Sequence, residues 1–149
     1  MKRSKRLSVV LQLFVQQEEK ASQNVQMARV TLEQQQNQLR DLVAYQEEYY
    51  QSVTGEAQQT VSIMQWRRLQ DYIEQLKGII AKQEYQVQLA EVDVQRAQDA
   101  WQQAYLKRKS LEGMVEKVVM QETLEADKKE QKNLDELVQQ LQQSRYNRS

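Results

Sequence analysis

Carboxylates are the side chains of this sequence that could carry acid–base chemistry, and the adjacent Asp135 and Glu136 are an example. Two carboxylates divide the roles of acid and base only where burial or a neighbouring charge separates their pKa values. The sequence contains no His, no Cys, no glycine-rich phosphate loop and no residues at metal-ligand spacing. We therefore expect no catalytic site, no metal and no cofactor, because long helices provide no cleft that excludes water from a carboxylate.

The composition indicates that the elements holding these residues are long helices. The chain has 149 residues with no Pro and three Gly, and 40% of it is hydrophobic. Its mean hydropathy is -0.87. Such a sequence has few helix breakers and too little apolar surface for a compact globule, but enough for a narrow helical seam. We predict an all-α fold forming a single coiled-coil domain over residues 1–149.

Apolar residues recur at alternating steps of three and four along the first third of the chain. The register holds for about six heptads, which is typical of a left-handed coiled coil. Polar residues interrupt it only at Glu18, Gln35 and Gln46. The apolar positions of this first seam are Leu7, Leu11, Phe14, Ala21, Val25, Ala28, Leu32, Leu39, Leu42, Tyr49 and Val53.

A second seam with the same spacing is interrupted only at Gln83 and Arg108. Because Trp66 and Trp101 lie on this seam, we expect both indoles to pack in the core. The apolar positions of the second seam are Trp66, Leu69, Ile73, Leu76, Ile80, Val87, Ala90, Val94, Ala97, Trp101, Ala104, Leu111, Val115 and Val118.

The short segment between the seams predicts an antiparallel hairpin. We expect one helix over about residues 5–52, a loop over about 53–60 and a second helix over about 61–143. Gly55 can end the first helix, and Thr60 or Ser62 can cap the second.

The register of the hairpin can be predicted by folding the chain about position 57 or 58. This places Tyr49 opposite Trp66, and Gln35 within a turn of Gln83. The first helix then runs out at about Leu111 of the second.

The second helix continues beyond its partner as a C-terminal overhang. Gly113 lies near this point, on the outer face of the helix. Past Val118 the seam changes phase, to Met120, Leu124, Gln131, Leu134, Val138 and Leu141. The charge-rich stretch 122–132 favours a solvated tail, whereas the weak apolar stripe favours docking on a partner.

Positions flanking the seams are mostly polar, but Tyr45, Tyr72 and Ile79 are not. With Leu42, Tyr49 and Leu76 beside them, they form an apolar, aromatic-rich strip near the loop. The strip either shields the core or binds a partner, since contiguous apolar patches rich in Tyr mark protein interfaces.

The charge balance and the length of the apolar runs indicate the cellular location of the protein and its class of partner. The 21 basic and 21 acidic residues cancel, which disfavours nucleic acid as a partner. The basic start, residues 2–6, and the apolar run 7–15 are similar to a signal peptide, but Gln12 interrupts the run and the helical register continues. No stretch has the length of a membrane span, and the lack of Cys fits a reducing compartment. We expect a cytoplasmic protein that meets a membrane only through partners.

Several short segments occur in a distinctive order and spacing, namely Arg3–Leu7, Leu39–Leu42, Tyr45–Tyr49, then Trp66, Leu69, Tyr72, Ile73, Leu76 and Lys77, and finally Glu130–Glu136. This set resembles the flagellar FliJ family, the stalk and chaperone-cycling component of the flagellar type III export ATPase. The resemblance covers nearly the whole chain.

The resemblance implies a non-enzymatic stalk and adaptor at the cytoplasmic face of the flagellar basal body. In the family, the end with both termini inserts into the hexameric export ATPase ring. The resemblance implies that residues 2–6 and 113–141 form this end here. The other half contacts the cytoplasmic domain of the export gate and the export chaperones. The family's binding surface maps here onto Gln38, Leu42, Tyr45, Tyr49, Tyr72, Leu76, Ile79 and Gln83.

Two other functions fit a coiled coil of this kind. One is a free-standing holdase chaperone that grips clients with the hairpin tip. The other is a homodimeric structural spacer, in which the seams pair between chains.

Overall fold

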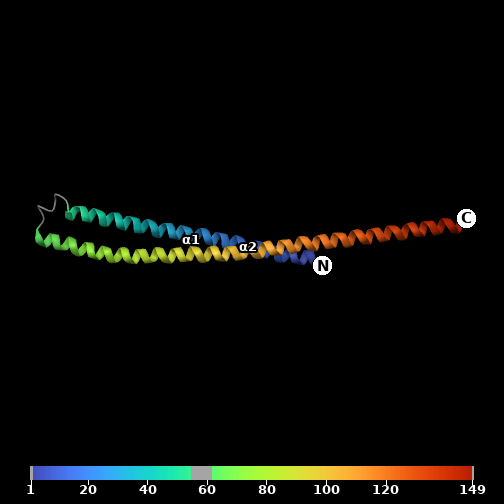
Figure 1. The fold of residues 1–149 in the computed structure, drawn as a ribbon, viewed down its shortest axis with the longest axis horizontal. Coiled ribbons are helices and arrows are strands. Elements are labelled where there is room, and N and C mark those ends of the chain that lie inside the picture. Colours follow the sequence, from blue (N-terminus) through green and yellow to red (C-terminus); the bar gives the residue numbers. More distant parts are fainter. Residues whose placement is uncertain (1, 55–61, 149) are drawn as a thin grey trace. The chain divides into compact units, whose positions relative to one another are not determined.

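The computed structural model describes residues 2–54 and 62–148, which form two long α-helices (Figure 1). Helix α1 spans Arg3–Thr54 and helix α2 spans Ile63–Arg148. The predicted all-helical hairpin is confirmed. The expected caps Gly55 and Thr60, together with most of the expected loop, lie outside the described residues.

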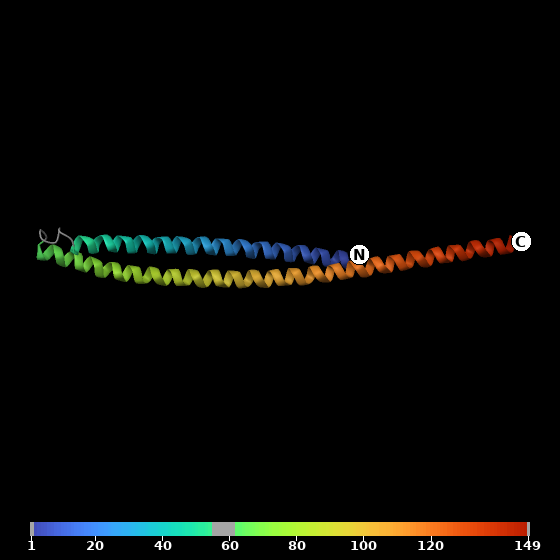
Figure 2. The same cartoon turned by 45° about the horizontal axis from the view of Figure 1, so that its top comes forward.

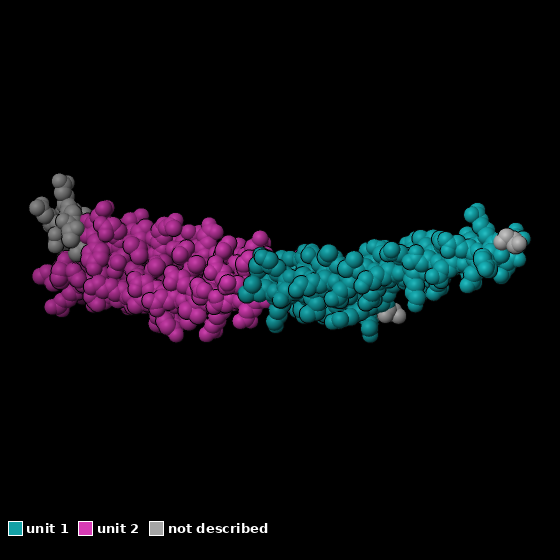
Figure 3. Space-filling model, turned by 45° about the vertical axis from the view of Figure 1, so that its right-hand side comes forward, with its two compact units in different colours: residues 1–18, 104–149 teal, residues 19–103 magenta. Residues whose placement is uncertain are grey.

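The chain divides into two compact units (Figure 3). Both helices contribute residues to each unit. Unit 1 is made of Met1–Glu18 and Ala104–Ser149, and unit 2 of Glu19–Gln103. In unit 2, Gln35 contacts Gln83 and Tyr49 contacts Tyr72. Later residues of α1 thus meet earlier residues of α2, so the helices are antiparallel.

The buried residues lie on the seams that the sequence predicts. In α1, every predicted seam position with a described side chain is buried or half-buried, including the polar Glu18, Gln35 and Gln46. Ile73 of α2 is the most enclosed side chain, at 2% exposure. Burying such a side chain contributes about 1.5–3 kcal/mol, so a continuous stripe of them holds the two helices together. The buried set is Val25, Ile73, Leu76, Ile80, Val87, Ala90 and Val118.

The prediction that Trp66 and Trp101 pack in the core is wrong. They are 40% and 37% exposed, respectively. A seam between two helices has solvent on both flanks, so it cannot enclose a side chain as large as an indole.

The start of α2 is fixed by Ser62. The backbone N–H of Gln65 donates to Ser62 Oγ at 3.2 Å, and the backbone N–H of Ser62 donates to Gln65 Oε1 at 3.3 Å. These two bonds form a capping box, which satisfies N–H groups that the first turn of a helix leaves without partners. The capping role predicted for Ser62 is confirmed.

The register of the hairpin differs from the prediction in two places. Within unit 2, the ring of Tyr49 packs against Tyr72, whereas folding about position 57 or 58 placed it opposite Trp66. Within unit 1, Ser4 bonds to Glu122, so α1 remains paired well past Leu111. In both places the partner in α2 lies further along the chain than predicted, and Glu18 pairs with Arg108 in the same displaced register. Heptad seams match each other again after every seven residues, so their spacing does not fix which heptads meet.

In unit 1, the C-terminal part of α2 continues past the N-terminus of α1 (Figure 2). All described residues after Glu122 are exposed. The predicted overhang is therefore present, but it begins after Glu122 and not at Leu111.

Candidate protein-binding surfaces

Three tyrosines from both helices form a continuous aromatic cluster in unit 2. The rings of Tyr45 and Tyr49 lie edge to face with centroids 5.1 Å apart, and their hydroxyls are 3.4 Å apart. The ring of Tyr49 is also 4.7 Å from that of Tyr72, at an interplanar angle of 37°. Aromatic pairs at such separations add stability beyond their buried area, so the cluster joins α1 to α2 at this end of unit 2.

Much of the cluster remains open to solvent. Tyr45 and Tyr72 are 44% and 38% exposed, and Ile79, one heptad after Tyr72 on the same face of α2, is 48% exposed. The hydrogen bond with the Tyr49 hydroxyl raises the pKa of Tyr45 above its ordinary value. A phenol is already neutral at physiological pH without this shift, so Tyr45 adds no charge to the surface.

The other residues expected on this surface divide between the core and the rim. Leu76 is 4% exposed, so its side chain supports the surface from beneath. Leu42 is half-buried, while Gln38 is exposed beside it on α1. The Gln83 amide donates to Gln35 within the seam.

The overhang of α2 presents a second apolar surface. Its apolar side chains follow a helical stripe and are all more than half exposed. A helix that packs none of its faces is only marginally stable in water. The exposed apolar stripe therefore favours binding of this helix to a partner. The stripe consists of Leu124, Leu134, Leu137, Val138 and Leu141.

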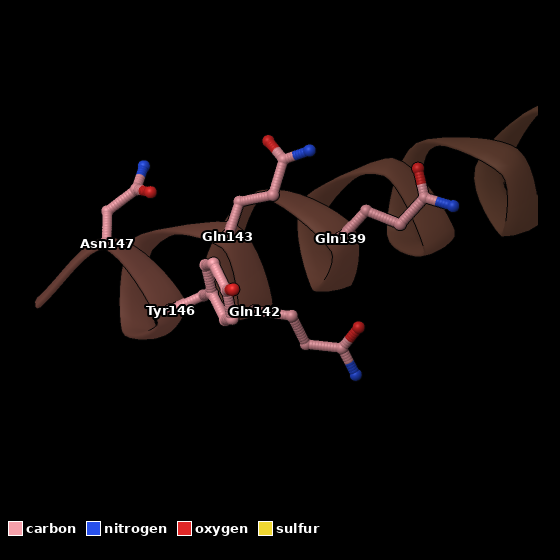
Figure 4. Close-up of a pocket in the computed structure, with 5 residues that line it drawn as sticks. All are labelled: Gln139, Gln142, Gln143, Tyr146 and Asn147. Atoms are coloured by element: carbon pink, nitrogen blue, oxygen red, sulfur yellow. The ribbon is translucent and has the colours of Figure 1, made fainter. Parts of the chain in front are cut away.

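A shallow hollow near the end of α2 offers no site for a small molecule. Figure 4 shows its lining side chains, which all come from one helix and point outward from it. A single helix cannot surround a ligand, and buried small-molecule sites are concave and largely enclosed. The lining residues are Gln139, Gln142, Gln143, Tyr146 and Asn147.

Unit 1 contains an ion cluster that the sequence analysis did not predict, although Glu18 and Arg108 stood out as polar interruptions of the seams. Arg108 Nε donates to Glu18 Oε2 at 2.6 Å and Nη2 donates to Glu18 Oε1 at 3.3 Å. Nη1 donates to Glu112 at 2.5 Å, and the guanidinium lies 5.1 Å from the ring centroid of Tyr105. The bonds to Glu18 and then to Glu112 raise the pKa of Arg108.

The N-terminus of α1 is capped by a residue of α2. Glu122 accepts hydrogen bonds from the backbone N–H of Ser4 at 3.1 Å and from its hydroxyl at 2.5 Å. The first turn of α1 has no acidic residue of its own, so Glu122 provides the negative charge that favours a helix N-terminus. The hydroxyl bond, and then the backbone bond, hold the pKa of Glu122 below its ordinary value.

Residues 2–54 and 62–148 contain no group of His, Cys, Asp or Glu that could hold a metal ion. In this part of the chain, neither helix has an apolar stretch long enough to cross a membrane. What the described residues do provide is a helical hairpin with two exposed apolar surfaces, the architecture of a coiled-coil protein that works through contacts with other proteins.

Comparison with known protein families identifies the family of coiled-coil proteins that this chain resembles. The family described as flagellar FliJ protein matches residues 3–147. The chain therefore belongs to the flagellar FliJ family, and it is a non-catalytic component of the flagellar export apparatus. No curated protein and no solved structure matches the chain significantly.

Proposed function

We propose that this protein is the stalk and adaptor of the flagellar export ATPase, with a different surface for each task. Unit 1 carries the overhang, which inserts into the hexameric ATPase ring. Unit 2 carries the aromatic-rich strip that includes Tyr45, Tyr49, Tyr72 and Ile79, called the tyrosine strip below. This strip binds the cytoplasmic domain of the export gate and the export chaperones. The protein acts at the cytoplasmic face of the flagellar basal body.

The observation that carries the insertion is the exposure of the overhang. From residue 123 to 148 no side chain is buried, yet Leu134 and Leu141 keep the spacing of a packed seam. A helix of this length gains its stability mainly from packing an amphipathic face, and a ring lumen would provide that packing. The polar majority of its surface also suits a shaft that must release as well as bind.

The strip supports the adaptor role because it presents aromatic area that the hairpin does not bury. The exposed parts of Tyr45 and Tyr72 adjoin the ring of Tyr49, and the exposed Ile79 follows Tyr72 by one heptad on α2. Rigid aromatic side chains give a partner large contact area at little entropic cost.

The two alternative functions have less support. A homodimeric spacer would use the seams between chains, but in each unit the seams of α1 and α2 are occupied by each other. The gripping tip that a holdase would need lies outside the described residues.

The proposal is tested by separating the two surfaces. Deletion of residues 127–149 should abolish stimulation of the export ATPase and leave gate and chaperone binding intact. Tyr45→Ala combined with Ile79→Ala should weaken gate or chaperone binding and leave ATPase stimulation intact. Circular dichroism should show that the hairpin remains folded in both variants.

A matched control uses other exposed apolar residues of α1. Met27 and Val30 are 68% and 54% exposed. Met27→Ala combined with Val30→Ala should affect neither activity. Unchanged ATPase stimulation after the deletion would overturn the insertion, and unchanged binding by the strip variant would show that the strip only shields the core.

A further inference from the structure

In unit 1, two polar contacts join α1 to α2, and a stretch of two heptads lies between them. Ser4 binds Glu122 at one end, and Glu18 binds Arg108 at the other. Ser4 and Glu18 are two heptads apart in α1, and Glu122 and Arg108 are two heptads apart in α2. Both contacts therefore specify the same alignment of the two helices.

The apolar residues between these contacts specify the alignment only weakly. They repeat with the heptad, so a slip by one heptad places apolar residues opposite apolar residues again. The positions between the contacts are Leu7, Leu11 and Phe14 in α1 and Leu111, Val115 and Val118 in α2.

The ion pair penalises such a slip. The side chains of Glu18 and Arg108 are only 19% and 23% exposed. A slip of one heptad would move Glu18 opposite Val115 in one direction, and Arg108 opposite Leu11 in the other. Either shift separates the Glu18 carboxylate from Arg108, while Arg108 keeps its bond to Glu112 within α2. A partly buried carboxylate without its partner costs more than the pair gains when formed.

We infer that the Glu18–Arg108 pair and the Ser4–Glu122 cap set the register of α1 on α2, and thereby the length of the overhang. In this register, α2 is free of α1 after Glu122. A slip of one heptad would lengthen or shorten the free helix by about 10 Å, at about 1.5 Å per residue. The consequence for depth of insertion into an ATPase ring rests on the proposed function; the register itself does not.

Setting a register differs from adding stability. Replacing a partly buried ion pair by apolar residues is often neutral or stabilising, because the charges no longer pay for desolvation. The polar pair instead excludes alternatives. A variant without both charges should therefore adopt several registers. Its melting temperature should equal or exceed that of the parent chain.

Distance measurement on the isolated chain tests this inference without any export partner. The sequence has no Cys, so Gln12→Cys and Lys117→Cys allow a spin-label pair on exposed positions of α1 and α2. The parent chain should give one narrow distance distribution by pulsed electron paramagnetic resonance. Glu18→Leu combined with Arg108→Leu should add populations displaced by one heptad, and the charge swap Glu18→Arg with Arg108→Glu should restore one.

The control pair is Glu74→Gln with Lys77→Gln, which removes an exposed ion pair within α2 and should leave the distribution unchanged. A single, parent-like distance in the doubly apolar variant would overturn the inference, whatever its melting temperature. If that variant does not fold, the inference is also wrong, because it requires the apolar seam to fold in more than one register. Ser4→Ala with Glu122→Gln, which leaves the seam intact, should broaden the distribution without unfolding.

Discussion

The side-chain amide of Gln83 in α2 donates to both oxygens that Gln35 of α1 offers it, the backbone carbonyl at 2.9 Å and Oε1 at 2.7 Å. The amide nitrogen of Gln83 thus makes two hydrogen bonds across the seam of unit 2. The amide group of Gln83 lies in a polar layer between the helices, and its place on the partner surface stays a prediction. We predict that Gln83→Ala lowers the free energy of unfolding by about 1 kcal/mol, measured by urea denaturation. No change in stability would contradict the structural role.

Ile73 and Ile79 provide a matched pair that separates the core from the exposed strip. They are the same residue type on the same helix, but Ile73 is 2% exposed and Ile79 is 48% exposed. Ile73→Ala should cost about 2–5 kcal/mol of unfolding free energy, as is typical of a buried isoleucine. Ile79→Ala should cost far less and should act on partner binding. Equal costs by chemical denaturation would contradict this assignment of core and surface.

Gly113 should tolerate a side chain and gain from it. It lies within α2, and a Cβ at this position would meet no atom within 4 Å. Gly113→Ala should raise the unfolding free energy by about 0.5–1 kcal/mol, because alanine loses less backbone freedom on entering a helix. Thermal unfolding measures the gain. A lower melting temperature would contradict the open space found around this position.

The bond between Ser4 and Glu122 makes part of the stability of unit 1 depend on pH. Glu122 has a pKa lowered from 4.5 by Ser4 and, to a lesser extent, by the charge of Lys2. Because the carboxylate binds protons less readily when folded, its contribution is fully present above pH 4.5 and is lost as the pH falls through the folded pKa.

The variant Glu122→Gln isolates this contribution. Its melting temperature should lie below that of the parent chain at neutral pH, and the difference should shrink as the pH falls below about 4.5. Glu125→Gln changes a neighbouring exposed carboxylate and serves as the control. A difference that grows on acidification would contradict the cap.

The sequence predicts the seams well because heptad spacing is a local property that survives in the fold. The polar Glu18, Gln35 and Gln46 are half-buried where the spacing places them. Ser62 is likewise predictable as a cap, because its chemistry depends on the next three residues alone.

The register and the surroundings of large side chains are not predictable in the same way. The ring of Tyr49 packs against Tyr72 and Ser4 binds Glu122 in a register displaced from the predicted one, because a seam that repeats every seven residues does not fix which heptads meet. The exposure of Trp66 depends on the width of the seam, which spacing does not report. Exposure alone does not identify a partner, so the binding role of the strip formed by Tyr45, Tyr49, Tyr72 and Ile79 stays a prediction.

The central claim is that the overhang and the strip meet different partners, and site-specific photo-crosslinking tests it most directly. A photoreactive phenylalanine analogue would replace Leu134 in the overhang or Tyr45 in the strip, which are 57% and 44% exposed in the free chain. With the export ATPase, the gate domain and the chaperones present together, the probe at 134 should crosslink to the ATPase, and the probe at 45 to the gate domain or a chaperone. Crosslinking of the ATPase from position 45 but not from position 134 would contradict the account.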